Sequence, residues 1–392
     1  MGQQNGAGVF RRDGVTWLAY GMLGFYNFLL SGLGPLMPSL RAELDISYGL
    51  ASLHFSAFAV GMILAGLVGD RIVARFGRTA TFWTGAAGLA IGAIALTIVH
   101  HPILTIGSIF VMGSVGSLVV VLIPAILADR HGSRRVTALV EANILAAATG
   151  ALSGVLIGAG ERTAFGWRGA YLLSLLMPLA LLLLYRNETL PATSRVRGGL
   201  AGRRVRLPRA YWAFWAAVVL SVCVEFSLIF WGADFLVAAG LATTTAATTV
   251  SLFLWGMVVG RIVGRGLGER IPPERLVIVA LTVAAAGFLV YWLAPSAMTT
   301  VVGLFVAGLG VANLFPLIAS LAMGVAPSGS NEAAARISFA SGSAILLAPL
   351  LLGALADAVG IRLAYSVVPL FICGAFAAVM AGRYLSGTAT DR

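Results

Sequence analysis

The sequence predicts an all-α integral membrane protein in which twelve transmembrane helices form two pseudo-symmetric six-helix bundles. Hydrophobic residues make up 59% of the 392 residues and charged residues only 10%, whereas a soluble domain carries roughly 25% charged residues. The apolar runs extend for about 20 residues without alternating, which indicates membrane-spanning helices rather than strands. A backbone in lipid must satisfy its own hydrogen bonds, and helices do so. Sequence motifs of the first half recur in the second half, which indicates two equivalent bundles.

Twelve apolar spans follow one another along the chain, and each is long enough to cross the roughly 30 Å hydrocarbon core as a helix. In chain order they cover 14–38, 50–69, 79–99, 103–128, 136–160, 167–186, 211–238, 244–264, 274–294, 298–324, 332–357 and 361–383.

One connection between spans is long and polar, and it divides the chain. It follows the sixth span and contains glycines and many arginines, among them Arg195, Arg197, Arg203, Arg204 and Arg206. We therefore expect an N-terminal six-helix bundle over 1–190, a cytoplasmic linker over 191–209 and a C-terminal six-helix bundle over 210–392.

The basic residues, all of them Arg, predict the orientation. They stand between apolar runs, so their partner is expected to be the lipid bilayer rather than nucleic acid. With a cytoplasmic N-terminus, the outside loops hold few arginines: Arg41, Arg162, Arg168 and Arg362. The remaining clusters then fall inside: Arg71, Arg75 and Arg78; Arg130, Arg134 and Arg135; the linker; and Arg261, Arg265, Arg270 and Arg275. This bias predicts a multi-pass protein of the cytoplasmic (inner) membrane with both termini in the cytoplasm.

The two halves share sequence at nearly one offset. Gly61-Met62 in the second span matches Gly256-Met257 in the eighth, 195 residues later. The segment 165–171, FGWRGAY, matches 359–365, VGIRLAY, at an offset of 194. Parallel repeats related by an axis along the membrane normal are typical of transporters.

A loop motif adds a family resemblance. Residues 66–78, GLVGDRIVARFGR, resemble the signature loop of the major facilitator superfamily, with a Gly, an Asp four residues later and a basic Gly-Arg turn. The second Gly comes four residues later than in the commonest form. The segment 353–360, GALADAVG, echoes the pattern. With the twelve spans and the repeat, the chain is identified as a member of this superfamily over its whole length, which implies a transporter and not an enzyme.

Branches of the superfamily are distinguished by shorter motifs. Many drug/proton antiporters carry an Arg in the fourth span where this chain has Ile109, and a Gly-Pro in the fifth where it has Gly150-Ala151. The segments 225–231 and 338–357 are loosely similar to fucose-permease-like sugar symporters. The missing antiporter motifs and the similarity to sugar symporters favour symport.

Glu225 is the strongest candidate for the mechanism. It stands about fifteen residues into the seventh span, near the membrane centre, where an ionisable group is costly and is usually functional. We expect it to couple transport to protons or to bind substrate, with no basic residue at comparable depth. The alternative is a neutral carboxylic acid that only joins helices by hydrogen bonds.

Other polar side chains at similar depth are predicted to line a cavity between the halves. Amides, hydroxyls and aromatic rings suit a hydroxylated or planar solute, although each could instead form an interhelical hydrogen bond. The candidates are Tyr20, Asn27, Ser114, Ser117, Trp231 and Asn313.

Charged residues at the cytoplasmic helix ends are predicted to form a gate. In the superfamily the second and eleventh helices meet, as do the fifth and eighth. That arrangement would pair Asp70 with Arg336 and Glu141 with Arg265, latching this side when the protein faces outward. Arg71 and Arg78 belong to the same gate region. Alternatively, each charge interacts with lipid headgroups separately.

Small residues at four-residue spacing are predicted to let these helices approach closely. The fifth span carries Gly150, Gly154 and Gly158, and the eighth carries Gly256, Gly260, Gly264 and Gly268.

The sequence therefore predicts a monomeric, proton-coupled secondary active transporter that imports a small polar organic solute, a sugar or related metabolite, by alternating access. Its expected partners are that substrate, protons and lipid, with no nucleic acid. A proton-driven multidrug or metabolite efflux antiporter is the first alternative, and a non-transporting sensor or scaffold the second. No catalytic residue, cofactor, metal site or ATP-binding loop is indicated.

Overall fold

The computed structural model describes residues 12–191, 207–294 and 296–390, and the regular structure in these ranges is helical. The first half contains α1 (Gly14–Leu44), α2 (Tyr48–Phe76), α3 (Arg78–Ile98), α4 (Pro102–Ser114), α5 (Leu118–His131), η1 (Gly132–Arg134), α6 (Arg135–Gly160), α7 (Gly166–Ser174) and α8 (Leu176–Tyr185). The second contains α9 (Arg209–Ala238), α10 (Thr243–Gly268), α11 (Pro273–Leu293), α12 (Ala297–Val311), α13 (Leu314–Gly324), η2 (Pro327–Gly329), α14 (Ser330–Val359), α15 (Ile361–Ala364) and α16 (Val367–Thr390).

The helices account for the twelve predicted spans. Ten stretches of the described chain are long and apolar enough to cross a membrane, and one of them, Pro102–Gly160, contains 59 residues. That stretch holds two crossings, α4–α5 and α6. The remaining crossing is α1, whose 31 residues exceed the length required although Asn27 and two tyrosines, Tyr20 and Tyr26, make it more polar. The predicted fold class is confirmed.

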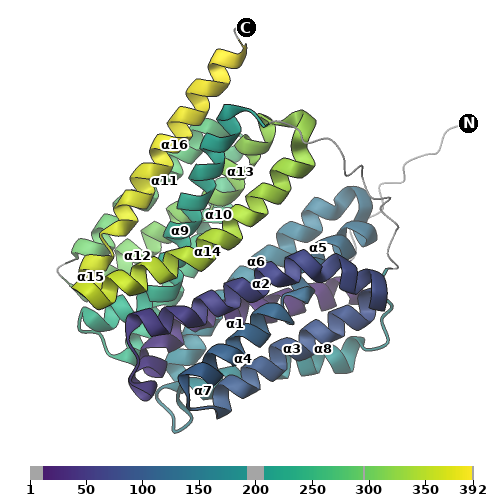
Figure 1. The fold of residues 1–392 in the computed structure, drawn as a ribbon, viewed down its shortest axis with the longest axis vertical. Helices are drawn as coiled ribbons and strands as arrows, with labels where there is room; N and C mark the ends of the chain where they lie inside the picture. The colour runs from purple at the N-terminus through teal and green to yellow at the C-terminus, as the bar shows by residue number, and fades with distance from the viewer. Residues whose placement is uncertain (1–11, 192–206, 295, 391–392) are drawn as a thin grey trace, which may run out of the picture.

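The helices form two bundles, α1–α8 and α9–α16, that lie side by side (Figure 1). A close glycine contact within the first bundle has an equivalent within the second, 195 residues later in the sequence. Gly113 in α4 packs against the backbone of Phe58 in α2, and Gly308 in α12 packs against the backbone of Phe253 in α10. Most of the predicted linker, residues 192–206, lies outside the described residues.

The predicted glycine ridges differ in what they contact. Gly154 and Gly158 of α6 do face α10, where they lie against the backbone carbonyls of Ala247 and Thr244. The glycines of α10 do not face α6: Gly256 and Gly260 pack against α12 within their own half. The expectation of two facing ridges was therefore wrong for α10. Its contact surface for α6 consists of Thr, Ala and Ser residues on another side of the helix.

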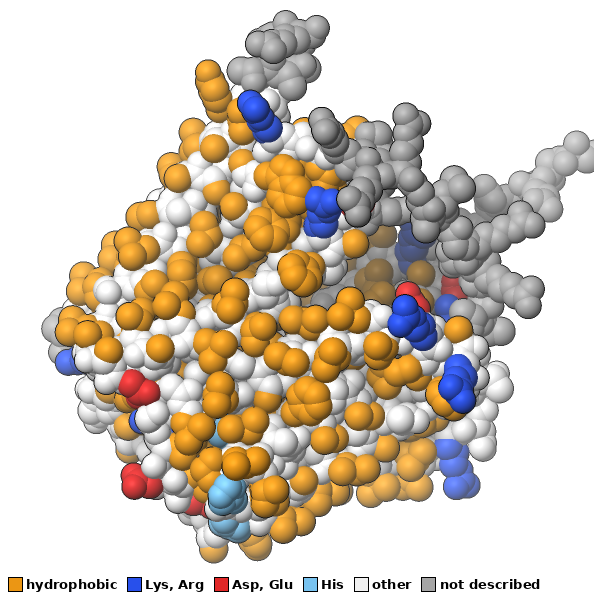
Figure 2. Space-filling view, in the orientation of Figure 1, with side chains coloured by type: hydrophobic (Ala, Val, Ile, Leu, Met, Phe, Trp, Pro, Cys, Tyr) orange, Lys and Arg blue, Asp and Glu red, His pale blue; other side chains and the backbone are white. Residues whose placement is uncertain are grey.

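The two ends of the molecule differ in how the halves meet. We call the end that carries Tyr185 and Arg209 the linker face, and the other end the opposite face. The halves pack tightly towards the opposite face, where Gly34 of α1 lies against the carbonyl of Ile229 in α9. On the linker-face side, the surface is hollowed between the halves, with Arg and acidic side chains nearby (Figure 2). The structure is therefore closed at the opposite face.

Candidate functional site

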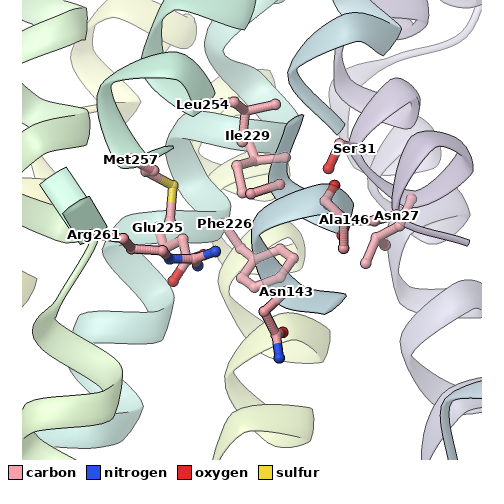
Figure 3. A pocket seen from close by; sticks show the side chains of 12 residues that line it. Asn27, Ser31, Asn143, Ala146, Glu225, Phe226, Ile229, Leu254, Met257 and Arg261 are labelled. Carbon is pink, nitrogen blue, oxygen red and sulfur yellow. The ribbon is translucent and has the colours of Figure 1, made fainter. Parts of the chain in front are cut away.

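A cavity of about 110 Å³ lies between the two halves. It is lined from four helices, α1 and α6 of the first half and α9 and α10 of the second (Figure 3). Because the halves close on one another towards the opposite face, we infer that solutes reach it from the linker face. Its lining residues are Asn27, Leu30, Ser31, Asn143, Ala146, Ala147, Glu225, Phe226, Ile229, Leu254, Met257 and Arg261.

Glu225 lies in this cavity, as far from the ends of α9 as the sequence indicated. The helix around it is long and apolar, and Ser227 satisfies its own hydroxyl by donating to the Cys223 carbonyl at 2.7 Å. Glu225 is half-buried and turns towards the cavity (Figure 3). A carboxyl group in such a cavity can bind a proton or accept hydrogen bonds from a solute.

Arg261 lies beside Glu225 in the cavity, which corrects the expectation that no basic residue shares its depth. The side chain projects from α10 towards Glu225 (Figure 3) and interacts with it electrostatically. Arg261 was predicted to belong to a cytoplasmic loop cluster, because it stands near the end of its span. In the structure α10 continues to Gly268, so Arg261 lies almost two turns inside the helix.

The first half supplies the neutral polar part of the lining. Asn27 donates from Nδ2 to the Ala146 carbonyl at 2.6 Å, which ties α1 to α6. Asn143 donates to the Leu139 carbonyl at 2.8 Å within α6. Ser31 completes this side of the cavity. Asn143 was not predicted, since its helical phase relative to the cavity is not readable without the neighbouring helices.

The other predicted lining residues lie outside this cavity, and each forms the local or interhelical hydrogen bond of the alternative interpretation. Tyr20 donates to Glu141 at 3.2 Å, and Ser117 is 3.1 Å from the Tyr26 hydroxyl. The remaining three donate to backbone carbonyls: Ser114 to Phe110 at 2.7 Å, Asn313 to Gly260 at 2.7 Å and Trp231 to Pro349 at 3.2 Å.

Helix breaks explain part of this difference. The fourth span is interrupted between Ser114 and Leu118, that is between α4 and α5, and the tenth is interrupted between Val311 and Leu314, that is between α12 and α13. Ser117 and Asn313 stand at these breaks. A continuous helix, as the sequence suggested, would have given both side chains a different direction.

A set of polar contacts joins the halves at the opposite face. Arg41 of α1 donates from Nη1 to Asp234 Oδ1 of α9 at 2.6 Å, and its guanidinium lies 3.4 Å from the centre of the Tyr48 ring. Asp357 of α14 accepts hydrogen bonds from the Tyr48 and Gly49 amides at 2.8 Å each. Since these amides begin α2, Asp357 meets the positive end of a helix dipole.

Aromatic packing lies beneath these polar contacts. Phe55 of α2 stacks on Phe230 of α9 with ring centres 4.3 Å apart, and Trp231 meets Phe55 edge-on at 5.3 Å. Trp231, predicted for the cavity, is therefore part of this closure. We call Arg41, Tyr48, Asp234 and Asp357 the opposite-face gate.

Comparisons with known proteins agree with this geometry. The family model described as Major Facilitator Superfamily matches residues 16–335 of the chain. The chain belongs to the major facilitator superfamily. It is accordingly a multi-pass membrane transporter of a small molecule and not an enzyme. Among solved structures, a bacterial homolog to the human lysosomal transporter Spinster, in an inward-facing and occupied conformation, superposes with a TM-score of 0.75 at 14% identity, covering 94% of this chain and 97% of that one.

Relatives within the superfamily are distant. An uncharacterized MFS-type transporter of Yersinia pestis is 23% identical over 363 residues, which cover 88% of this chain and 91% of the relative. A chloramphenicol resistance protein of Streptomyces lividans is 27% identical, over 69% and 68% of the two chains. A glucose/galactose transporter of Brucella abortus is 33% identical over 36% of this chain and 33% of its own length.

The predicted linker-face gate of this major facilitator is not assembled in the present conformation. Asp70, Arg71 and Arg265 are exposed. Glu141 instead accepts from Arg12 at 2.7 and 2.8 Å. The pairs were predicted for a conformation closed at this face, whereas here the face is open, so they stay predictions.

The other predicted gate residues are held within their own halves. Arg336 pairs with Glu332 on α14, and its guanidinium lies 5.0 Å from the centre of the Trp212 ring. Arg78 donates to Asp129 at 2.6 Å, which joins α3 to α5 in the first half. Each of these contacts joins residues of one half and does not reach the other half.

Asp13 anchors the start of α1 on the same face. Its carboxylate caps the helix by accepting from the Thr16 amide at 3.0 Å, and it pairs with Arg130. Burial acts to raise the pKa of the Asp13 carboxyl, but the hydrogen bonds from Thr16 and the contact with Arg130 outweigh it and hold the pKa below its ordinary value. Across the part of the chain that the structure describes, no group of three or more His, Cys, Asp or Glu is arranged to hold a metal ion.

Proposed function

We propose that this protein is a proton-coupled secondary active transporter of the cytoplasmic (inner) membrane that imports a small polar organic solute, a sugar or related metabolite, by symport. The observation that carries the proposal is Glu225, an ionisable group half-buried in a cavity between the two halves. Ionisable groups at membrane depth mark substrate and proton pathways more often than they serve packing. Glu225 would load a proton with the solute and release it after the halves rock.

The arginine distribution supports a cytoplasmic linker face and therefore cytoplasmic termini. The conformation described here, closed at the opposite face, would then be inward-facing. In the outward-facing state the opposite-face gate would open, and the pairs Asp70–Arg336 and Glu141–Arg265 would close the cytoplasmic side. The moving units would be the bundles 1–190 and 210–392, joined by the linker 191–209. The two bundles enclose the site by themselves, which supports a monomer as the working unit.

The lining of the cavity supports a polar solute. Asn27, Ser31 and Asn143 offer amide and hydroxyl groups that can bond to substrate hydroxyls. The partial similarity to a glucose/galactose transporter points the same way.

Proton-driven efflux is the second candidate. Leu30, Phe226, Ile229, Leu254 and Met257 form an apolar side of the cavity that could hold a drug-like ring. The similarity to a chloramphenicol resistance protein, which covers about two thirds of both chains, supports this candidate.

Solute-driven proton movement in liposomes tests coupling and separates the two candidates. The purified protein is reconstituted with a pH-sensitive dye inside, after a thermal-shift screen of sugars, carboxylates and drugs has identified a binder. Addition of that solute outside should acidify the lumen under symport and alkalinise it under antiport.

Glu225→Gln should abolish the pH change while solute counterflow, which requires no net proton transfer, persists. Glu269→Gln, at the exposed end of α10, is the matched control and should behave like the unmodified protein. Solute uptake without any pH change, or a full pH change with Glu225→Gln, would contradict proton coupling through Glu225.

A further inference from the structure

We propose that the cargo carries a carboxylate group and that Arg261 is the residue that binds it. This inference rests on the proposed function, because it takes the cavity between the halves as the transport site. It narrows the expected solute from a polar molecule in general to a small organic anion.

Arg261 offers hydrogen-bond donors that the protein itself does not use. A guanidinium is always charged and carries five N–H donors in a fixed fork. Within the described residues, no ion pair or hydrogen bond involves the Arg261 guanidinium, although the side chain is half-buried. By contrast, Arg41, Arg78 and Arg168 each bond directly to a carboxylate. The Arg261 donors face the cavity from the side of the second half.

Glu225 faces Arg261 without bonding to it directly. The two side chains lie next to each other on the second-half side of the cavity (Figure 3) and interact electrostatically. Because Glu225 does not bond to the guanidinium of Arg261, the cavity beside that guanidinium is suited to a carboxylate group of the solute. Guanidinium–carboxylate pairs are strong because two parallel N–H···O bonds can form, and the low dielectric of a closed cavity strengthens them.

Other charges on the neighbouring helices are engaged elsewhere or exposed. Arg41 and Asp234 bond to one another at the opposite face, Glu141 bonds to Arg12 and Tyr20, and Arg336 bonds to Glu332. Arg265 is exposed on the linker-face side. A solute in the cavity therefore meets the charges of Glu225 and Arg261, and an anionic group on it has Arg261 as its partner.

The rest of the lining extends the match to a hydroxylated acid. Asn27, Ser31 and Asn143 lie across the cavity from Arg261, on the first half (Figure 3). A carboxylate on Arg261 and hydroxyls on these groups would make one molecule bridge the two halves. When Glu225 carries the transported proton it is neutral, so a neutral sugar of the same shape would leave the guanidinium without a counter-charge in the closed cavity. An unpaired buried charge is strongly unfavourable.

Thermal unfolding of the full chain in detergent tests the inference with matched pairs of probes. The pairs are glucuronate and glucose, lactate and lactamide, and benzoate and benzamide, all at one ionic strength set with sodium chloride. At least one carboxylate should raise the Tm in a saturable way, and its neutral counterpart should not. Arg261→Gln should weaken that carboxylate by about tenfold or more, as expected for loss of a charge-assisted hydrogen bond.

Two further variants keep the test decisive. Arg261→Lys retains the charge without the fork and should bind the carboxylate more weakly than the unmodified protein but better than Arg261→Gln. Arg275→Gln, an exposed arginine on α11, should bind it as the unmodified protein does.

Equal shifts with acid and neutral probes would overturn the inference, as would no shift with any carboxylate or an Arg261→Gln affinity equal to that of Arg275→Gln. Binding is measured without a gradient, so a failure of proton coupling leaves this result unaffected.

Discussion

The opposite-face gate allows a quantitative prediction for Asp234→Asn. Asp234 is 2% exposed and its partner Arg41 is 20% exposed, with 2.6 Å between Nη1 and Oδ1. Removing one partner of a buried pair costs about 3–5 kcal/mol. Two features lower this figure here: Arg41 keeps contact with solvent and with the Tyr48 ring, and Asp234 Oδ2 has no hydrogen-bond partner.

We therefore expect Asp234→Asn to destabilise the closed opposite face by about 2–3 kcal/mol. The pair joins α1 of the first half to α9 of the second at this face, so we expect the loss to fall on the conformation closed there. A shift of this size changes the ratio of the two conformations by roughly 30- to 150-fold. A protein that rests almost wholly in the closed form would acquire a clearly populated open form.

Spin-label distances between the halves measure this shift. Labels are placed at Ala42→Cys and Ala238→Cys, two exposed positions beyond the gate on α1 and α9, after Cys223 and Cys373 have been replaced by Ser. The unmodified gate should give mainly short distances, and Asp234→Asn should add a longer population.

A double-mutant cycle shows whether the pair itself is responsible. In an Arg41→Ala background, Asp234→Asn should have little further effect on the distances. An unchanged distance distribution in the Asp234→Asn protein, or equal effects of this change with and without Arg41, would show that the pair does not hold this face closed.

Two further predictions concern the helix contacts that closure requires. Gly154→Leu should hold the opposite face open and stop transport, because a side chain there meets the Ala247 carbonyl at 2.6 Å; the same spin labels check it, and transport at the normal rate would argue against the contact. Asp70→Arg should reduce transport and the double change with Arg336→Asp should partly restore it; solute uptake into liposomes checks this, and a double variant no better than the single ones would rule out the pairing.

Sequence alone could predict the fold because the signals are repeated many times. Span length, arginine bias and the offset of 195 are each read over long stretches, and an error of a few residues does not alter them. The place of Glu225 near the middle of α9 follows from the same counting.

Side-chain direction could not be predicted, because it depends on helical phase and on helix breaks. Asn313 and Ser117 stand at breaks between helices, and Gly256 turns towards its own half rather than towards α6. Arg261 was wrongly placed in a cytoplasmic loop cluster because it lies close to the end of its predicted span. The helix itself continues to Gly268.

The opposite-face gate was missed for another reason. Its partners are far apart in the chain, with 193 residues between Arg41 and Asp234 and 309 between Tyr48 and Asp357. The sparse outside arginines, Arg41 among them, were a signal for this pair, but no repeat or local spacing indicates the partner.

The luminal pH of proteoliposomes reports whether Glu225 couples solute movement to a proton. Liposomes containing the dye are given the identified solute outside, first with the unmodified protein and then with Glu225→Gln. We predict luminal acidification with the first, and with the second no pH change but intact solute counterflow. Acidification of equal rate and extent with Glu225→Gln would contradict proton coupling through Glu225.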